Sequence, residues 1–367
     1  MASKALTLCL LVATLVGASA ATSPEPVFYP RTPHTPPSLG RHPFLSHRQL
    51  IKLLANDTPL VDPTGSIRPE EIPPPTPVTC GKRMPGTAHT VQCNAAAPLS
   101  GIVLVPPRRA TASLVLLHGY TDVPYIYLTL LKVLLKSKPN AWSSVRVVLP
   151  FAPRVPVQLE DAELDNPYAW YDASPTFITT LSDVVEGNIT DVDAVERRVL
   201  TAKEDVDSLG LFLSTRRIEA IVAAEHRELT RGGGNRRPAG GSPTGRVVLA
   251  GHSLGAVMAT HVSLTSRVRL AAVVALQGFV ADAPRLNRVP GTVAGGDRGY
   301  PVELVSGSAD VAVPPSLVAA SASIVRRLLR GKARVGYTEQ RGVTHTSFFL
   351  AGPDADAVAQ VLTRYLG

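Results

Sequence analysis

The chain is poor in cysteine and in aromatic residues. Its 367 residues include three cysteines and two tryptophans, and aromatic side chains make up only 5% of the total. The formal net charge of +8 comes from scattered basic groups such as Arg236-Arg237 and Arg326-Arg327, with no aromatic residues interleaved. Nucleic-acid-binding surfaces cluster their basic residues and add stacking partners. We therefore expect no nucleic-acid partner and interpret the charge as a solvated basic surface.

A long uncharged apolar run is also missing. The best candidate, Ala5 to about Val16, spans roughly a dozen residues, whereas a membrane-spanning helix needs about 20. Lys4 precedes this run and the small-residue site Ala18-Ser19-Ala20 follows it, which is the order of a secretory signal peptide. We expect cleavage after Ala20, no stable membrane span and a secreted protein. An uncleaved anchor is the alternative.

The few cysteines agree with export. Cys9 would leave with the signal peptide, so the mature chain would keep only Cys80 and Cys93. Disulfides form and persist in exported proteins, so these two can pair, and two unrelated thiols are the alternative. No group of His, Cys and Asp residues has the spacing of a metal site, and we expect neither a metal nor an organic cofactor.

Proline divides the chain into regions. Prolines recur from Ala21 to about Pro77, which removes backbone donors and predicts a proline-rich leader or linker over residues 21–77. A globular domain is expected over residues 78–367. Within it, residues 231–245 are rich in Gly, Pro and Arg and predict a flexible surface insertion.

From Val78 onward, β-branched runs alternate with helical patterns. The strand candidates are Ala112–Leu117, Val145–Leu149, Arg246–Ala250, Leu270–Ala275, Val302–Ser306 and Ala333–Tyr337. The longest helical pattern, Val192–Leu229, predicts one long helix or two consecutive ones, with Gly210 as a candidate break. This alternation predicts an α/β fold with a mostly parallel sheet and helices on both faces.

A strand, a sharp turn and a helix surround Ser253. Gly251-His252-Ser253-Leu254-Gly255 matches G-x-S-x-G, in which two glycines let a strand turn into a helix with the serine exposed at the apex. A buried-strand run, Arg246–Ala250, precedes the motif, and a small-residue helical pattern, Ala256–Ser263, follows it. This order predicts a nucleophile elbow with Ser253 as nucleophile.

A serine nucleophile needs a base and an acid that orients the base. Asp310 follows the predicted strand at Val302–Ser306, and His345 lies in the loop after the predicted strand at Ala333–Tyr337. The order Ser, Asp, His suits this fold, so Asp310 is the expected acid and His345 the expected base. Asp282, which follows the preceding strand, is the alternative acid.

The oxyanion formed during attack needs two preorganised donors. The backbone N–H of Leu254 is expected to supply the first. The second is expected from the loop after the strand at Ala112–Leu117, where the N–H of Tyr120 is best placed.

These elements together resemble the phospholipase/carboxylesterase branch of the α/β hydrolases, which includes the acyl-protein thioesterases. The likeness runs from about Leu114 to the C-terminus. Besides the elbow, Asp310 and His345, its anchors are His118-Gly119-Tyr120-Thr121-Asp122, Leu149-Pro150-Phe151-Ala152-Pro153-Arg154-Val155-Pro156 and Ala169-Trp170-Tyr171-Asp172. The branch usually carries Phe-Ser-Gln around its nucleophile, whereas this chain has His252-Ser253-Leu254, a form shared with many lipases and general esterases.

The resemblance implies an α/β-hydrolase fold and a hydrolase of carboxylic esters or thioesters that works through an acyl-enzyme. A secreted lipase or general carboxylesterase is the first alternative. A serine peptidase on the same fold and a catalytically inactive binding protein are the others, because fold alone does not fix function.

Overall fold

The computed structural model describes residues 79–94, 99–120, 122–153, 168–172, 181–202, 207–231, 246–288, 299–345 and 353–366. The expected signal peptide, the proline-rich leader and residues 232–245 of the expected insertion lie outside these described residues.

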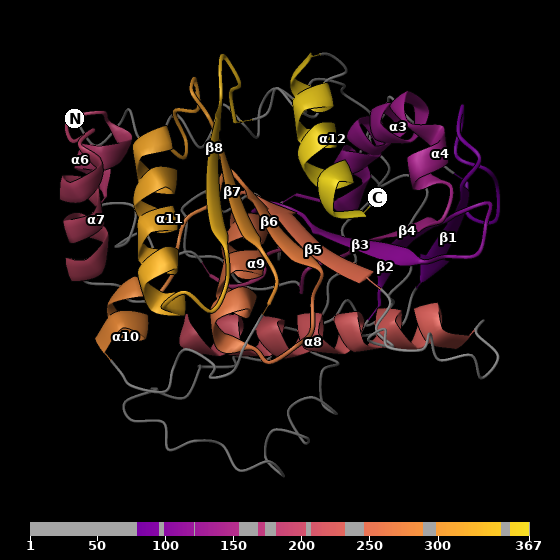
Figure 1. Ribbon diagram of the computed structural model, residues 1–367, viewed down its shortest axis with the longest axis horizontal. Coiled ribbons are helices and arrows are strands. Elements are labelled where there is room, and N and C mark those ends of the chain that lie inside the picture. The colour runs from indigo at the N-terminus through magenta and orange to yellow at the C-terminus, as the bar shows by residue number, and fades with distance from the viewer. Residues whose placement is uncertain are drawn as a thin grey trace, which may run out of the picture. The chain divides into compact units, whose positions relative to one another are not determined.

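An eight-stranded sheet forms the centre of the described part (Figure 1). Its strands are β1 (Thr90–Asn94), β2 (Gly101–Val105), β3 (Ala112–Leu117), β4 (Val145–Pro150), β5 (Arg246–His252), β6 (Ala272–Leu276), β7 (Val302–Gly307) and β8 (Val335–Gln340). The order across the sheet is β1-β2-β4-β3-β5-β6-β7-β8. β2 pairs antiparallel with β1 and with β4, and every later neighbour pair is parallel. This order and direction are those of the α/β-hydrolase fold, as predicted.

Helices cover the sheet on both faces. They are η2 (Pro124–Ile126), α3 (Tyr127–Ser137), α4 (Pro139–Trp142), α6 (Ser182–Val185), α7 (Val192–Thr201), α8 (Ser208–Arg231), α9 (Leu254–Thr265), α10 (Ala283–Arg288), α11 (Pro315–Leu329) and α12 (Pro353–Leu366). Figure 1 shows α3, α4 and α12 on one side of the sheet and α8 and α9 on the other. No helix in these described ranges is long and apolar enough to cross a bilayer.

The alternation of side chains along the strands explains the two faces. On β3, Val115 and Leu117 belong to the core cluster that includes α8, α9 and α11, whereas Leu114 and Leu116 belong to the cluster that includes α3 and α12. Successive side chains of a strand point to opposite faces, so a strand covered on both faces is mostly apolar. All six residues of β3 are buried accordingly.

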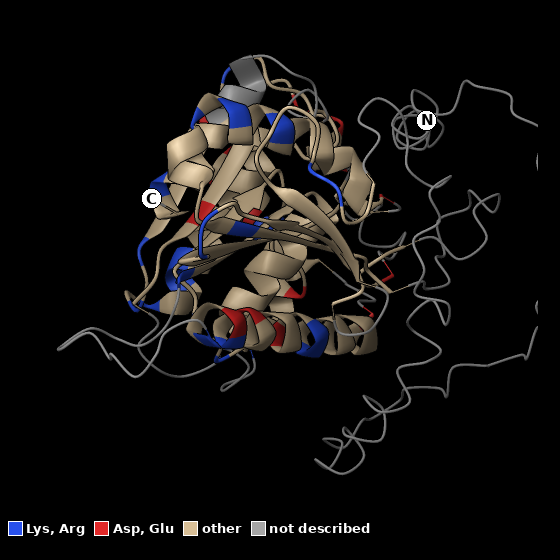
Figure 2. Cartoon of the chain, turned by 90° about the vertical axis from the view of Figure 1, so that its right-hand side faces the viewer, with Lys and Arg blue, Asp and Glu red and all other residues tan. Residues whose placement is uncertain are grey.

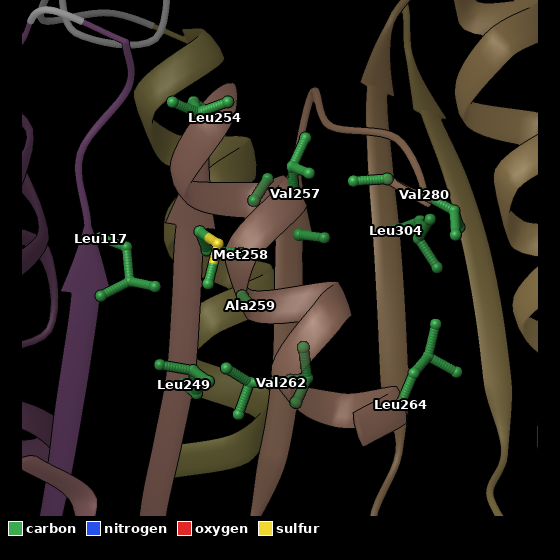
Figure 3. Close-up of a cluster of buried hydrophobic side chains, with 14 of the residues drawn as sticks. Leu117, Leu249, Leu254, Val257, Met258, Ala259, Val262, Leu264, Val280 and Leu304 are labelled. Atoms are coloured by element: carbon green, nitrogen blue, oxygen red, sulfur yellow. The ribbon is translucent and has the colours of Figure 1, made fainter. Parts of the chain in front are cut away.

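Helix α9 lies in the middle of the first cluster. From Leu254 to Leu264 every residue is buried, and Figure 3 shows Val257, Met258 and Val262 among side chains from neighbouring strands and loops. Burial on all sides requires an apolar helix with small residues where the backbone approaches the sheet, which is the pattern that the sequence has. The packing fixes the start of α9, and with it the position of Ser253, which precedes the helix.

The long helical pattern forms two helices, α7 and α8, and Gly210 does not break it. Gly210 lies in the first turn of α8, where its N–H donates to Oδ1 of Asp207 at 2.8 Å. A Cβ on Gly210 would collide with the Asp207 side chain and press on Tyr171, so this position requires glycine for close approach. The predicted break at Gly210 was therefore wrong, because α8 begins at Ser208 and continues through Gly210.

Two further features agree with patterns in the sequence. A disulfide joins Cys80 to Cys93, and their Cα atoms lie 5.6 Å apart. Cys93 lies within strand β1, and Cys80 lies in the segment that precedes it. Figure 2 shows the basic residues spread over several separate helices and loops, and α8 carries acidic residues as well as basic ones.

Candidate active site

Ser253 occupies a strained turn between β5 and α9. Its backbone dihedrals are φ 52° and ψ −121°, a region that residues other than glycine rarely adopt. Backbone hydrogen bonds hold this conformation: the Ser253 N–H donates to the Leu276 carbonyl at 2.9 Å, and its own carbonyl accepts from Ala256 and Val257 at 2.9 and 3.0 Å. The turn lifts the serine out of the strand at the carboxyl edge of the sheet, where ligands bind in α/β proteins.

The two elbow glycines are required by crowding. A Cβ on Gly251 would collide with the backbone of Gly255, and a Cβ on Gly255 would collide with the carbonyl groups of Leu117 and His118. Any larger residue would push α9 away from β3 and move the serine.

Ser253, His345 and Asp310 form a continuous chain of contacts. Nε2 of His345 lies 3.0 Å from Oγ of Ser253, and Nδ1 of His345 lies 2.8 Å from Oδ2 of Asp310. The Asp310 side chain is fully buried, whereas 12% of the His345 side chain is exposed. The three residues come from the turns after β5, β8 and β7, respectively.

The geometry also separates the two candidate acids. Oδ1 of Asp310 accepts N–H groups from Ala312 and Val313, both at 2.9 Å, so the carboxylate is fixed while its other oxygen faces the imidazole. Asp282 instead forms an ion pair with Arg285, and burial raises the pKa of its carboxyl group. Asp310 is therefore the acid that contacts His345.

The loop after β3 lies against the serine. A Cβ added to Gly119 would lie 3.4 Å from Cβ of Ser253, which puts the backbone of this loop beside the elbow. Tyr120 follows Gly119, and Leu254 is the first residue of α9. Thr121 lies outside the described residues.

His118 connects this loop to its neighbours. Its Nδ1 lies 2.8 Å from the Gly119 carbonyl, and its Nε2 accepts the Ala152 N–H at 2.8 Å, so the ring carries its proton on Nδ1. Burial lowers the pKa of His118 to about 4, which keeps the ring neutral. The indole N–H of Trp170 donates to the His118 carbonyl at 2.9 Å. The His-Gly, Ala-Pro and Trp-Tyr-Asp segments of the sequence thus meet at one place.

Three residues near the site were not assigned a role from the sequence. Oδ2 of Asp122 accepts the Gly119 N–H at 3.2 Å, and burial raises the pKa of this carboxyl group to about 6. Tyr127 and Gln277 contact the elbow histidine and the loop of His345, respectively. No three His, Cys, Asp or Glu side chains in the described ranges gather in a way that could hold a metal ion.

The model of the phospholipase/carboxylesterase family matches residues 199–348, which include the elbow, Asp310 and His345. Over these residues the chain is therefore similar to the phospholipase/carboxylesterase family. Members of this family are α/β hydrolases, in agreement with the strand order described above.

Curated relatives point to the same family. Acyl-protein thioesterase 1 of Cryptococcus neoformans var. neoformans serotype D is 27% identical over 182 residues, in strain JEC21 and in strain B-3501A alike. The match covers 50% of this chain and 60% of the relative, so the chain spans less than two thirds of the length of the family members it matches.

Solved structures are similar at lower identity. Arabidopsis thaliana SOBER1 is 15% identical with a TM-score of 0.48, covering 71% of this chain and 100% of its own. Zea mays acyl-protein thioesterase 2 is 20% identical with a TM-score of 0.46, covering 72% of this chain and 98% of its own.

Proposed function

We propose that this protein is a serine hydrolase that cleaves carboxylic esters or thioesters through an acyl-enzyme intermediate. The observation that carries the proposal is the contact chain from Asp310 through His345 to Ser253, at 2.8 and 3.0 Å, with the serine in a strained elbow. A serine hydroxyl is a weak nucleophile at neutral pH, so it needs a base within hydrogen-bond reach and a partner that orients the base.

In the proposed reaction, Oγ of Ser253 attacks the acyl carbonyl carbon while Nε2 of His345 takes the hydroxyl proton. Asp310 stabilises the imidazolium that forms. The bond to the leaving oxygen or sulfur then breaks, and His345 returns the proton to that leaving group. Water attacks the acyl-enzyme with the same base, releasing a carboxylic acid and restoring the serine.

We assign the oxyanion to the backbone N–H groups of Tyr120 and Leu254. Support comes from the close approach of Gly119 to Ser253 and from the position of Leu254 at the start of α9, where N–H groups have no partner within the helix. Each such donor typically lowers the barrier by about 2.7 to 4 kcal/mol.

The nucleophile assignment is tested with a fluorophosphonate probe, which reacts with activated serines. Ser253→Ala should abolish labelling. The matched control is Ser263→Ala, because Ser263 is buried in α9, the helix that follows Ser253, and its hydroxyl donates only to the Thr260 carbonyl among the described contacts. Labelling of Ser253→Ala at the parental rate would overturn the assignment.

The proposed substrate class rests on the family and on the thioesterase name of the curated relatives. The His252-Ser253-Leu254 elbow favours a lipase or general carboxylesterase as a second candidate. Acyl thioesters, p-nitrophenyl esters of graded length and peptide amides separate these activities. Preferred thioester cleavage supports a thioesterase. Long-chain ester cleavage without thioester cleavage supports a lipase or general carboxylesterase. Cleavage of amides alone would contradict both.

We also propose that the chain is exported. The charge, apolar run and small-residue site at residues 4–20 support this, and so does the Cys80–Cys93 disulfide, since such bonds persist in oxidising compartments. The N-terminus of the protein recovered from the medium of a secreting host should be Ala21. Retention of the full-length chain inside the cell would contradict the proposal.

A further inference from the structure

The loop that carries His345 is held at three successive carbonyl groups, each by a donor from a different element. The Ala309 N–H donates to the Val343 carbonyl at 3.0 Å, Nε2 of Gln277 donates to the Thr344 carbonyl at 2.7 Å, and Nε2 of His252 lies 3.0 Å from the His345 carbonyl. Two of these three donors are side chains. The backbone position of the base therefore depends on two specific residues.

The protonation of His252 follows from its partners. A carbonyl oxygen only accepts, so Nε2 of His252 must carry a proton toward His345. Burial, and then the charge of nearby His345, lower the pKa of His252 well below its ordinary value, so the ring is neutral. A neutral ring with a proton on Nε2 presents Nδ1 as an acceptor, and the hydroxyl of Tyr127 lies 3.1 Å from Nδ1.

Tyr127 extends this chain to the loop after β3. Its hydroxyl oxygen accepts the Gly119 N–H at 3.0 Å. Its single proton has two candidate acceptors, Nδ1 of His252 at 3.1 Å and Oδ2 of Asp122 at 3.5 Å, and the shorter contact is the stronger. Hydrogen bonds therefore run in one direction from Gly119 through Tyr127 and His252 to the carbonyl group of His345.

Gln277 supports the same arrangement. It has a φ of 54°, which is costly for a residue with a side chain, and such strain persists where the surroundings fix the conformation. Its side chain interacts with His252 in addition to holding Thr344. The His252 ring also lies against the His345 ring, with centroids 4.8 Å apart.

We propose that His252 is a positioning residue for His345: its Nε2–H fixes the backbone of the base, and its Nδ1 couples that base through Tyr127 to the loop that receives the oxyanion. This inference rests on the proposed function and deepens it. His252 touches no reacting atom in this scheme. Small displacements of a reacting group are costly, because a shift of about 1 Å can reduce the rate by about 100-fold.

Three substitutions at His252 separate its contact with the His345 carbonyl from its contact with the Tyr127 hydroxyl. His252→Phe keeps an aromatic ring and removes both contacts. His252→Gln carries an amide N–H near the position of Nε2, where it can reach the His345 carbonyl, whereas the shorter His252→Asn reaches only toward Tyr127. We expect His252→Phe to lower kcat by about 10- to 100-fold with KM unchanged. His252→Gln should recover most of this loss, and His252→Asn should not.

The matched control is His261→Gln. His261 is also a buried histidine, lies one element further along in α9, and has no described contact with Ser253, Asp310 or His345. Its substitution should lower the melting temperature without changing kcat measured well below that temperature. A merely structural role for His252 would give the same result as His261.

A second readout does not depend on turnover. The proton on Nδ1 of His345, which faces Asp310, gives a separate downfield proton NMR signal when this contact is ordered. We expect the signal to be sharp in the parent and in His252→Gln, and to shift or broaden in His252→Phe and His252→Asn. Should His252→Phe not fold, the comparison of Gln with Asn provides the same test.

The outcomes distinguish this inference from the proposed function. If the parent is labelled by fluorophosphonate and His252→Phe keeps parental kcat and the parental NMR signal, His252 does not position the base. Equal recovery by Gln and Asn would also overturn the inference. A parent that neither turns over nor reacts with the probe would instead contradict the proposed function, while the NMR comparison would still test the positioning.

Discussion

His345 and Asp310 are joined by a 2.8 Å contact between Nδ1 and Oδ2. The other oxygen of Asp310 accepts two backbone N–H groups, from Ala312 and Val313, so the carboxylate cannot rotate without losing both. Because a carboxylate only accepts, the imidazole must keep a proton on Nδ1. Its Nε2 is then left to accept the proton of Ser253.

Asp310→Asn should leave the fold intact and lower kcat by on the order of 10⁴-fold, because an amide favours the wrong imidazole tautomer and cannot stabilise the imidazolium. Steady-state hydrolysis of a p-nitrophenyl ester measures the effect. Asp282→Asn is the control, since Asp282 pairs with Arg285 instead. Thermal unfolding of both variants separates lost activity from lost stability. The acid assignment fails if Asp282→Asn is the inactive variant.

The disulfide between Cys80 and Cys93 should contribute measurably to stability. A bridge that closes a loop of this length is worth about 3 kcal/mol in the chain-entropy model, so replacing both cysteines by serine should lower the free energy of unfolding by about that amount. Urea denaturation measures this difference. Mass spectrometry without reduction should find one linked peptide pair, and two thiols open to alkylation in the native protein would contradict the bridge.

The sequence predicted the central strands, because β3, β5 and β7 are short, mostly apolar runs rich in Val and Leu. It did not reveal β1 and β2. Both are short antiparallel strands at one edge of the sheet, and β1 mixes the buried Val91 with the exposed Gln92 and other polar residues, a pattern typical of a loop as much as of a strand.

The residues around His345 were harder to predict than those of the contact chain itself. His252 contacts Tyr127 across 125 positions of the sequence and the His345 carbonyl across 93. Spacing along the chain carries no information on such pairs, which depend on packing between elements. The one available signal was that histidine stands in the elbow where the family branch usually has phenylalanine.

His261 should make the protein sensitive to acid. Burial, and then the charge of Arg285, lower its pKa to about 4 in the folded protein, whereas an unfolded histidine titrates near 6.5. The unfolded state therefore binds a proton first as the pH falls through about 6.5, and stability is lost from there down to about pH 4. His118 and His252, whose pKa values are also lowered by burial, act in the same direction.

His261→Gln removes this titration while keeping a polar side chain. Between pH 7.5 and pH 5, the free energy of unfolding of the variant should fall by about 2 kcal/mol less than that of the parent. Urea denaturation of both proteins at the two pH values provides the comparison. Parallel losses in parent and variant would show that His261 does not contribute.

Asp122 should act in the opposite direction. Burial raises the pKa of its carboxyl group to about 6, against the opposing influence of nearby His345 and of the Gly119 N–H, so the folded protein keeps this proton at a pH where the unfolded chain has lost it. The folded state then binds more protons between about pH 4 and pH 6, and the stability due to this group falls as the pH rises through that range.

Asp122→Asn keeps an oxygen that can accept the Gly119 N–H but carries no charge. Relative to the parent, the variant should therefore gain roughly 2 kcal/mol between pH 4.5 and pH 8, less than the full shift because part of the titration lies below pH 4.5. Urea denaturation at both pH values measures this gain, with His261→Gln as a control in which the relative gain runs toward low pH instead. An Asp122→Asn variant whose stability follows the parental pH dependence would mean that the carboxyl group is ionised throughout this range.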